Sequence, residues 1–148
     1  YAADRAEHVA TLIKPALEQG KTIVCDRYVH SNLAYQGYGL GYDLETILKV
    51  NQAATGGLMP DMCIFLDIAP EIGLQRAKKD TSRDRGVSDR IENRGLIFQQ
   101  RVRKGFQTLA KEDPVKIKII SVENKNILQI HEEIWNYVIN FIRSDDKT

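Results

Sequence analysis

Apolar residues recur every three or four positions from Ala2 onward, and this spacing predicts an amphipathic helix that ends near Gly20. Pro15 lies inside the stretch and predicts a kink or a short break there. The apolar run TIVC (22–25) comes next and ends at Asp26, which predicts a first buried strand. The chain thus begins as a helix followed by a strand.

The rest of the chain continues this alternation. The pattern predicts helices over about 44–54, from Pro70, over 91–111 and over 127–142, and strands at MCIFLDI (62–68) and KIKII (116–120). These strands are apolar throughout rather than alternating, which is typical of parallel strands covered on both faces. Strands separated by helices predict a doubly wound α/β fold. We find no linker or internal repeat, and we expect one domain over residues 1–148.

Composition narrows the function classes. The chain has 148 residues, 43% of them apolar, which suits one globular domain. Its 21 basic and 20 acidic residues give a formal net charge of +1, which argues against broad binding to nucleic acids or membranes. Cys25 and Cys63 are interpreted as buried, inert thiols, and so few cysteines without a signal peptide predict a cytoplasmic location. Any anion site must therefore be local.

The stretch CDRYVHSNLAYQG (25–37) places polar and aromatic side chains directly after the first predicted strand. In α/β sheets ligands collect at the carboxyl ends of the strands, and Asp26, Arg27 and Asp67 all fall at such ends. An arginine there can present its planar fork to a phosphate. Asp26 can hold a water of a magnesium shell or orient the arginine. The alternative is a structural ion pair between Asp26 and Arg27.

Ser31, Asn32, Tyr35 and Gln36 follow at spacings that share one face of a short helix. Hydroxyl and amide groups can read a base edge or a sugar, and an aromatic ring can stack on a base or exclude an extra hydroxyl. The alternative is a polar helix start with Ser31 as its N-cap. The next residues, YGLGY (38–42), indicate an irregular loop and do not match a phosphate-cradling glycine motif.

Two further groups carry candidate chemistry. Tyr1 and Arg5 are i,i+4 neighbours, so a ring and a guanidinium could sandwich a base, although such a pair is more often an ordinary surface contact. The charged segment 78–94 includes Arg83, Arg85 and Arg90 between two predicted helices. It is either a solvated loop or a lid that brings arginines onto a transferring phosphoryl group.

These residues together resemble the bacterial thymidylate kinases. VCDRYVHSNLAYQ (24–36) resembles that family's signature position by position, YAADRAEHV and KPAL resemble its acceptor-site helix, LMPDMCIFLDI its fourth strand, and SDRIE the end of its lid. The resemblance implies a P-loop NTPase-like nucleoside monophosphate kinase fold. It also implies Mg²⁺ with ATP, transfer of the γ-phosphoryl group of ATP to thymidine monophosphate (dTMP), and a homodimer.

The resemblance assigns roles to the candidates. For dTMP, Tyr1 would stack on thymine, Arg5 would hydrogen-bond the base, Ser31 and Asn32 would line the base pocket, Gln36 would lie at its edge, Tyr35 would pack under the sugar, and Arg27 would clamp the phosphate. Asp26 would lie near the magnesium, and Arg83, Arg85 and Arg90 are the candidate catalytic lid arginines. The loop Glu123, Asn124, Lys125 and Asn126 would border the adenine of ATP.

One departure from the family is large. The motif G-x-x-x-x-G-K-[ST], which cradles the donor phosphates, does not occur in this sequence, and the first residue is Tyr1. We therefore expect the C-terminal portion of a thymidylate kinase, with three strands present, the family's first two strands missing, and little or no activity. The alternatives are a non-catalytic nucleotide-binding half, a degenerate kinase that needs a partner segment, or a kinase for another monophosphate.

Overall fold

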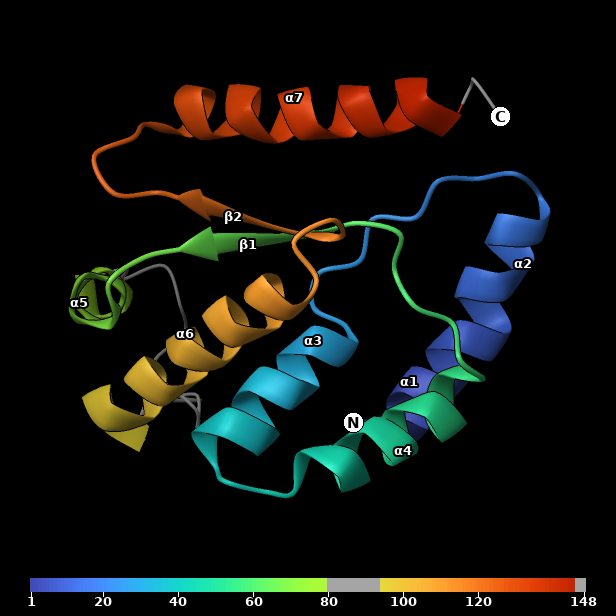
Figure 1. Ribbon diagram of the computed structural model, residues 1–148, viewed down its shortest axis with the longest axis horizontal. Coiled ribbons are helices and arrows are strands. Elements are labelled where there is room, and N and C mark those ends of the chain that lie inside the picture. The colour runs from blue at the N-terminus through green and yellow to red at the C-terminus, as the bar shows by residue number, and fades with distance from the viewer. Residues whose placement is uncertain (80–93, 146–148) are drawn as a thin grey trace.

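The computed structural model describes residues 1–79 and 94–145 (Figure 1). Its elements in chain order are α1 (Ala2–His8), the π-helix η1 (Val9–Ile13), α2 (Lys14–Glu18), α3 (Val29–Asn32), the π-helix η2 (Leu33–Gly39), α4 (Leu44–Thr55), β1 (Cys63–Asp67), α5 (Pro70–Lys79), α6 (Gly95–Glu112), β2 (Ile117–Ser121) and α7 (Ile127–Asp145). Within these ranges no helix combines the length and the apolar character needed to cross a membrane.

The sheet of the described residues is the parallel pair β1 and β2. Cys63 lies opposite Ile117 and Asp67 opposite Ser121, so the carboxyl ends of the two strands meet at one edge. Figure 1 shows α7 on one side of this pair and α6 with α3 on the other, as expected for an α/β fold. The connection from β1 to β2 runs through α5 and α6, because parallel strands need a long crossover.

The expected third strand is wrong. Residues 22–25 form no strand in the structure, and the side chain of Val24 is 96% exposed. A strand exists only where a neighbouring strand pairs with its backbone groups, and in the described part of the chain β1 and β2 pair with each other instead. The expected burial of both thiols is wrong as well, since Cys25 is exposed and Cys63 is half-buried.

The opening helix is interrupted earlier than Pro15. The π-helical turn η1 separates α1 from α2, and Pro15 lies in the first turn of α2. Proline lacks a backbone N–H, and its ring clashes with the carbonyl four positions earlier. The turn that precedes the proline is the one that widens, so the break falls over Val9–Ile13.

A small aromatic core joins α6 to η2. Ala34, Phe98 and Val102 are buried together, with Tyr35 and Phe106 packed against them. Gly105 on α6 allows the close approach of the two helices, because a Cβ atom there would lie 2.7 Å from Tyr38. The stretch 38–42, predicted to be a loop, begins inside η2, which extends to Gly39. The contact with α6 holds the face of η2 that carries Tyr35.

Candidate functional site

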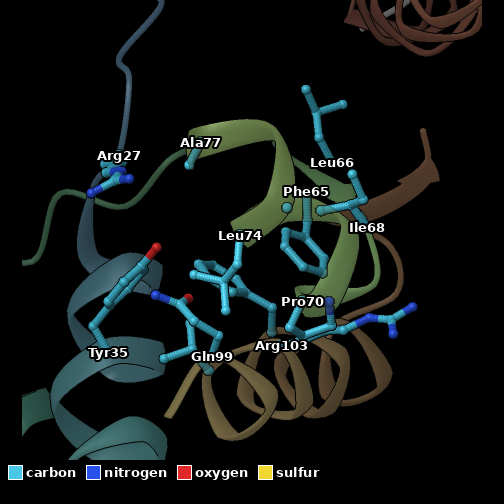
Figure 2. Close-up of a pocket in the computed structure, with 13 residues that line it drawn as sticks. Arg27, Tyr35, Phe65, Leu66, Ile68, Pro70, Leu74, Ala77, Gln99 and Arg103 are labelled. Carbon is cyan, nitrogen blue, oxygen red and sulfur yellow. The ribbon is translucent and has the colours of Figure 1, made fainter. Parts of the chain in front are cut away.

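A cleft of about 260 Å³ opens between η2, β1, α5 and α6 (Figure 2). Its lining is mainly apolar and comes from Phe65, Leu66, Ile68, Pro70, Gly73, Leu74, Ala77, Val102 and Phe106. The polar contributions come from Arg27, Tyr35, Gln99 and Arg103. An apolar cleft with a few polar groups at its rim is the usual form of a small-molecule site.

Stacked rings form one wall of the cleft. Phe65 and Phe106 lie parallel, with ring centroids 4.5 Å apart and 14° between their planes. The ring of Tyr35 meets Phe106 edge-on at 6.4 Å and Phe98 at 6.1 Å. These contacts hold the Tyr35 ring in place, and Figure 2 shows its hydroxyl on the side of Arg27.

Arg27 stands at the mouth of this cleft in an unusual backbone conformation. Its φ of 66° lies in the left-handed region, which is strained for a residue other than glycine and is found preferentially at functional sites. Its guanidinium lies 5.3 Å from the centre of the Tyr35 ring. Within the described residues it forms no ion pair with a carboxylate, so the alternative of a structural Asp26–Arg27 pair is wrong. The arginine is exposed and oriented by the ring.

Asp67 is also at a strand end, and its carboxylate pairs with an arginine of α6. Its two carboxylate oxygens accept hydrogen bonds from Nε and Nη2 of Arg103 at 2.7 and 2.8 Å. These bonds raise the pKa of Arg103 above its ordinary value. Figure 2 shows the Arg103 guanidinium directed away from Arg27, so this pair closes the far end of the cleft and joins β1 to α6.

The candidate base-binding residues occupy a second region, on α1, α3 and η2. Among the described residues, the Arg5 guanidinium contacts the ring of Tyr28 and not that of Tyr1, which is 78% exposed. Its Nη1 donates to Oδ1 of Asn51 at 2.6 Å, and its guanidinium lies 5.7 Å from the ring of Tyr28. Sequence reasoning missed Asn51, although a polar residue on the buried stripe of α4 was the signal that could have identified it.

Asn32 and Gln36 are brought together one helical turn apart. Nδ2 of Asn32 donates to Oε1 of Gln36 at 2.7 Å, and both side chains are half-buried. Ser31 lies inside α3, whose N-cap is Tyr28, so the alternative that made Ser31 a cap is wrong. The Tyr28 hydroxyl donates to the backbone oxygen of Leu58 at 3.2 Å, which fixes the start of α3 against the end of α4.

Electrostatics link Arg5 to the start of the 25–37 stretch. Cys25 is exposed, but partial desolvation by its neighbours still raises the pKa of its thiol. The charge of Asp26 raises this pKa further, and the charge of Arg5 lowers it. Burial also raises the pKa of the Tyr28 hydroxyl, and Arg5 again acts in the opposite direction. The Arg5 guanidinium thus lies over the Tyr28 ring, and its charge also acts on the Cys25 thiol.

Comparison with known proteins identifies the family. The family model described as thymidylate kinase matches residues 1–134. The chain belongs to the thymidylate kinase family. The family resemblance seen in the sequence is thus confirmed, together with the α/β fold.

The relatives match over most of this chain. It is 47% identical to the thymidylate kinase of Synechococcus sp. (strain JA-2-3B'a(2-13)) over 138 residues, which are 93% of this chain and 63% of that relative. It is 50% identical to the thymidylate kinase of Trichodesmium erythraeum over 119 residues, 80% of this chain and 51% of the relative. The solved structure of the Ehrlichia chaffeensis thymidylate kinase matches with a TM-score of 0.69 and 29% identity, covering 93% of this chain and 61% of that one. The chain thus spans 63% of the length of the first of these relatives.

The remaining candidate site residues of this thymidylate kinase family member are those of the predicted lid and of the loop after β2. Arg83, Arg85 and Arg90 belong to residues 80–93, outside the described ranges. In the loop after β2, Glu123 accepts a hydrogen bond from the backbone of Ala69 at 2.9 Å. In the same loop, Lys125 pairs with Glu133, Asn124 has a φ of 58°, and Asn126 and Gln129 cap the start of α7 reciprocally.

Proposed function

We propose that this protein transfers the γ-phosphoryl group of ATP to dTMP, giving dTDP, and that residues 1–79 and 94–145 supply the side that binds dTMP. The observation that carries the proposal is Arg27, an exposed arginine with a left-handed backbone, stacked on Tyr35 at the mouth of an apolar cleft. A guanidinium in this setting can receive the acceptor phosphate through paired hydrogen bonds. The family membership supports the same substrate class.

The base-binding end fits a thymine by its donors and acceptors. Because Nδ2 of Asn32 donates to Gln36, the amide pair keeps Oδ1 of Asn32 as an acceptor and Nε2 of Gln36 as a donor. Thymine offers an N–H donor beside a carbonyl acceptor, which matches this pair. In the proposal Ser31 lines the same pocket and Tyr1 covers the base. Tyr35, held by two phenylalanines, packs under the sugar and disfavours a 2′-hydroxyl.

The donor side is a separate part of the proposal. The sequence contains no P-loop motif, so we propose that these 148 residues alone transfer the phosphoryl group slowly or not at all. The lid arginines Arg83, Arg85 and Arg90 would stabilise the transition state, an effect worth about 10³–10⁵ in rate when one arginine is added. The loop Glu123–Asn126 would border the adenine of ATP. Its hydrogen bond to the backbone of Ala69 holds it near the carboxyl end of β1.

Magnesium fits this site as a companion of ATP. Across the described residues no three His, Cys, Asp or Glu side chains form a group that could hold a metal ion. Mg²⁺ keeps several waters and binds through one or two carboxylates together with substrate phosphates. The exposed carboxylate of Asp26, next to Arg27, would hold one water of that shell. The ion would neutralise charge on the phosphates when ATP is bound.

Assembly is proposed from the family together with the exposed face of the opening helices. Leu12 and Leu17 are 52% and 39% exposed there, and a second copy of the chain could cover them. Light scattering should give twice the mass of one chain. Leu12→Asp should lower that mass, whereas a single-chain mass for the unaltered protein would reject the homodimer.

Calorimetric titration with dTMP tests the acceptor side directly. Arg27→Ala should weaken dTMP binding by about 10- to 100-fold, because it removes charge-assisted hydrogen bonds to the phosphate. Arg101→Ala, which removes an exposed arginine of α6, is the matched control and should bind as the unaltered protein does. Absence of binding by the unaltered protein, or equal binding by the two variants, would reject the proposal.

A nucleotide-binding half without catalysis is the second candidate, favoured by the missing P-loop motif. Chromatographic detection of dTDP after incubation with ATP, Mg²⁺ and dTMP separates the two. Sustained turnover by the 148 residues would reject the second candidate. Binding of dTMP without turnover would support it. A preference for guanylate or deoxyuridylate over dTMP would instead indicate a kinase for another monophosphate.

A further inference from the structure

Two residues hold Arg5, each from a different side. Tyr28 belongs to the signature stretch 24–36, and Asn51 lies outside it. On one side its Nη1 donates to Oδ1 of Asn51 at 2.6 Å, a contact between residues 46 positions apart. On the other its guanidinium lies 5.7 Å from the centre of the Tyr28 ring. Tyr28 in turn is tied to Leu58 by its hydroxyl. The two contacts together set both the position and the plane of the guanidinium.

Asn51 is a costly residue for its location. It is 2% exposed on the buried stripe of α4, and its Nδ2 has no hydrogen-bond partner among the described residues. A buried donor without a partner is destabilising, whereas an apolar side chain of similar size would avoid that loss. Packing of α1 on α4 therefore does not account for an asparagine here. Its one bonded atom, Oδ1, is the atom that meets Arg5.

We infer that Asn51 is a positioning residue, which fixes Arg5 so that its remaining N–H groups face the base of the bound nucleotide. The inference rests on the proposed function, because it names how one arginine of that site is oriented. A guanidinium carries five N–H donors, and Asn51 uses one group at Nη1. The donors left over can bind an acceptor, such as a keto oxygen of a pyrimidine. An exocyclic amino group at the same place would present a donor to a donor.

The test compares dTMP with deoxycytidine monophosphate (dCMP), which carries an amino group where thymine carries a keto oxygen. Calorimetry gives both affinities for six proteins: unaltered, Asn51→Leu, Asn51→Asp, Arg5→Ala, the double variant Arg5→Ala/Asn51→Leu, and the control Gln52→Leu. Asn51→Leu removes the acceptor and also the unpaired donor. It should weaken dTMP binding about 5- to 20-fold and reduce the preference over dCMP, with no fall in the melting temperature. Gln52→Leu, at the exposed neighbouring position, should change neither affinity.

Two further variants separate positioning from a structural role. Asn51→Asp keeps an oxygen for Arg5, so it should retain dTMP affinity within about threefold and preserve the preference over dCMP. In the Arg5→Ala background, Asn51→Leu should have no additional effect on affinity, because Asn51 acts only through Arg5. If Asn51→Leu does not fold, the folded Asn51→Asp protein decides the matter, and loss of the preference in it overturns the inference.

The remaining outcomes are distinct. Unchanged affinity and preference in folded Asn51→Leu overturn the inference and leave the proposed function standing. An additional loss of affinity in the double variant also overturns it, since Asn51 would then act by another route. Failure of the unaltered protein to bind dTMP overturns the proposed function, and the inference with it.

Discussion

Replacing Arg103 by methionine should destabilise the fold, because it leaves the carboxylate of Asp67 buried without a partner. In the structure that carboxylate accepts two hydrogen bonds from the guanidinium, at 2.7 and 2.8 Å. The side chain of Asp67 is 12% exposed and that of Arg103 is 32% exposed. Methionine has a similar length and no charge, so packing against the cleft changes little while both bonds disappear.

The expected loss of unfolding free energy follows from the burial of Asp67 and Arg103. Removing one partner of a fully buried pair costs about 3–5 kcal/mol. Arg103 is a third exposed, and water screens part of the interaction, so we expect about 2–3 kcal/mol here. In urea, with a slope of roughly 2 kcal/mol/M for a chain of this size, the unfolding midpoint should fall by about 1–1.5 M.

Urea unfolding followed by circular dichroism measures this shift, with Arg101→Met as the exposed control. A second comparison isolates the unpaired charge. The double variant Asp67→Leu/Arg103→Met removes both charges and should recover to within about 1 kcal/mol of the unaltered protein. A midpoint for Arg103→Met that equals the control would refute the reasoning. So would a double variant as unstable as Arg103→Met alone, because the loss would then come from packing.

Three further predictions concern packing, reactivity and pH. Gly105→Ala should lower the unfolding free energy by about 1–3 kcal/mol in thermal unfolding, because the added Cβ would lie 2.7 Å from Tyr38 of η2. Gly73→Ala is the control and should not destabilise the protein, because the nearest atom to its Cβ would lie at 3.5 Å. Exposed Cys25 should react with a disulfide reagent faster than half-buried Cys63. Asp26→Asn should lower the pKa of Cys25 and speed its reaction at fixed pH. An equal rate in the variant would show that the charge of Asp26 does not raise this pKa. Burial lowers the pKa of His30 below its ordinary value near 6.5. The unfolded chain therefore binds the proton first, and stability falls as the pH drops below that value. The difference between the unfolding midpoints at pH 7.5 and 5.5 should be smaller in His30→Gln, and an unchanged difference would contradict this prediction.

Local patterns in the sequence were sufficient for much of the architecture. The helices α4, α5 and α7 and the strands β1 and β2 lie where apolar periodicity predicts them, because periodicity expresses contacts within one element. The residues of the family signature likewise stand in one short stretch, so Arg27 and Tyr35 could be named together. Their stacking at 5.3 Å agrees with that grouping.

Only the tertiary structure decided the contacts that cross the chain. Residues 22–25 have the apolar character of a strand, yet pairing depends on a neighbour, and in the described residues they have none. Asp67 meets Arg103 across 36 positions and Arg5 meets Asn51 across 46. Such pairs leave no periodic signal, because each depends on how two helices or a helix and a strand pack. The sequence therefore determined most of the helices and both strands, and it grouped the candidate residues of 25–37. Packing determined that residues 22–25 form no strand and which side chains face one another.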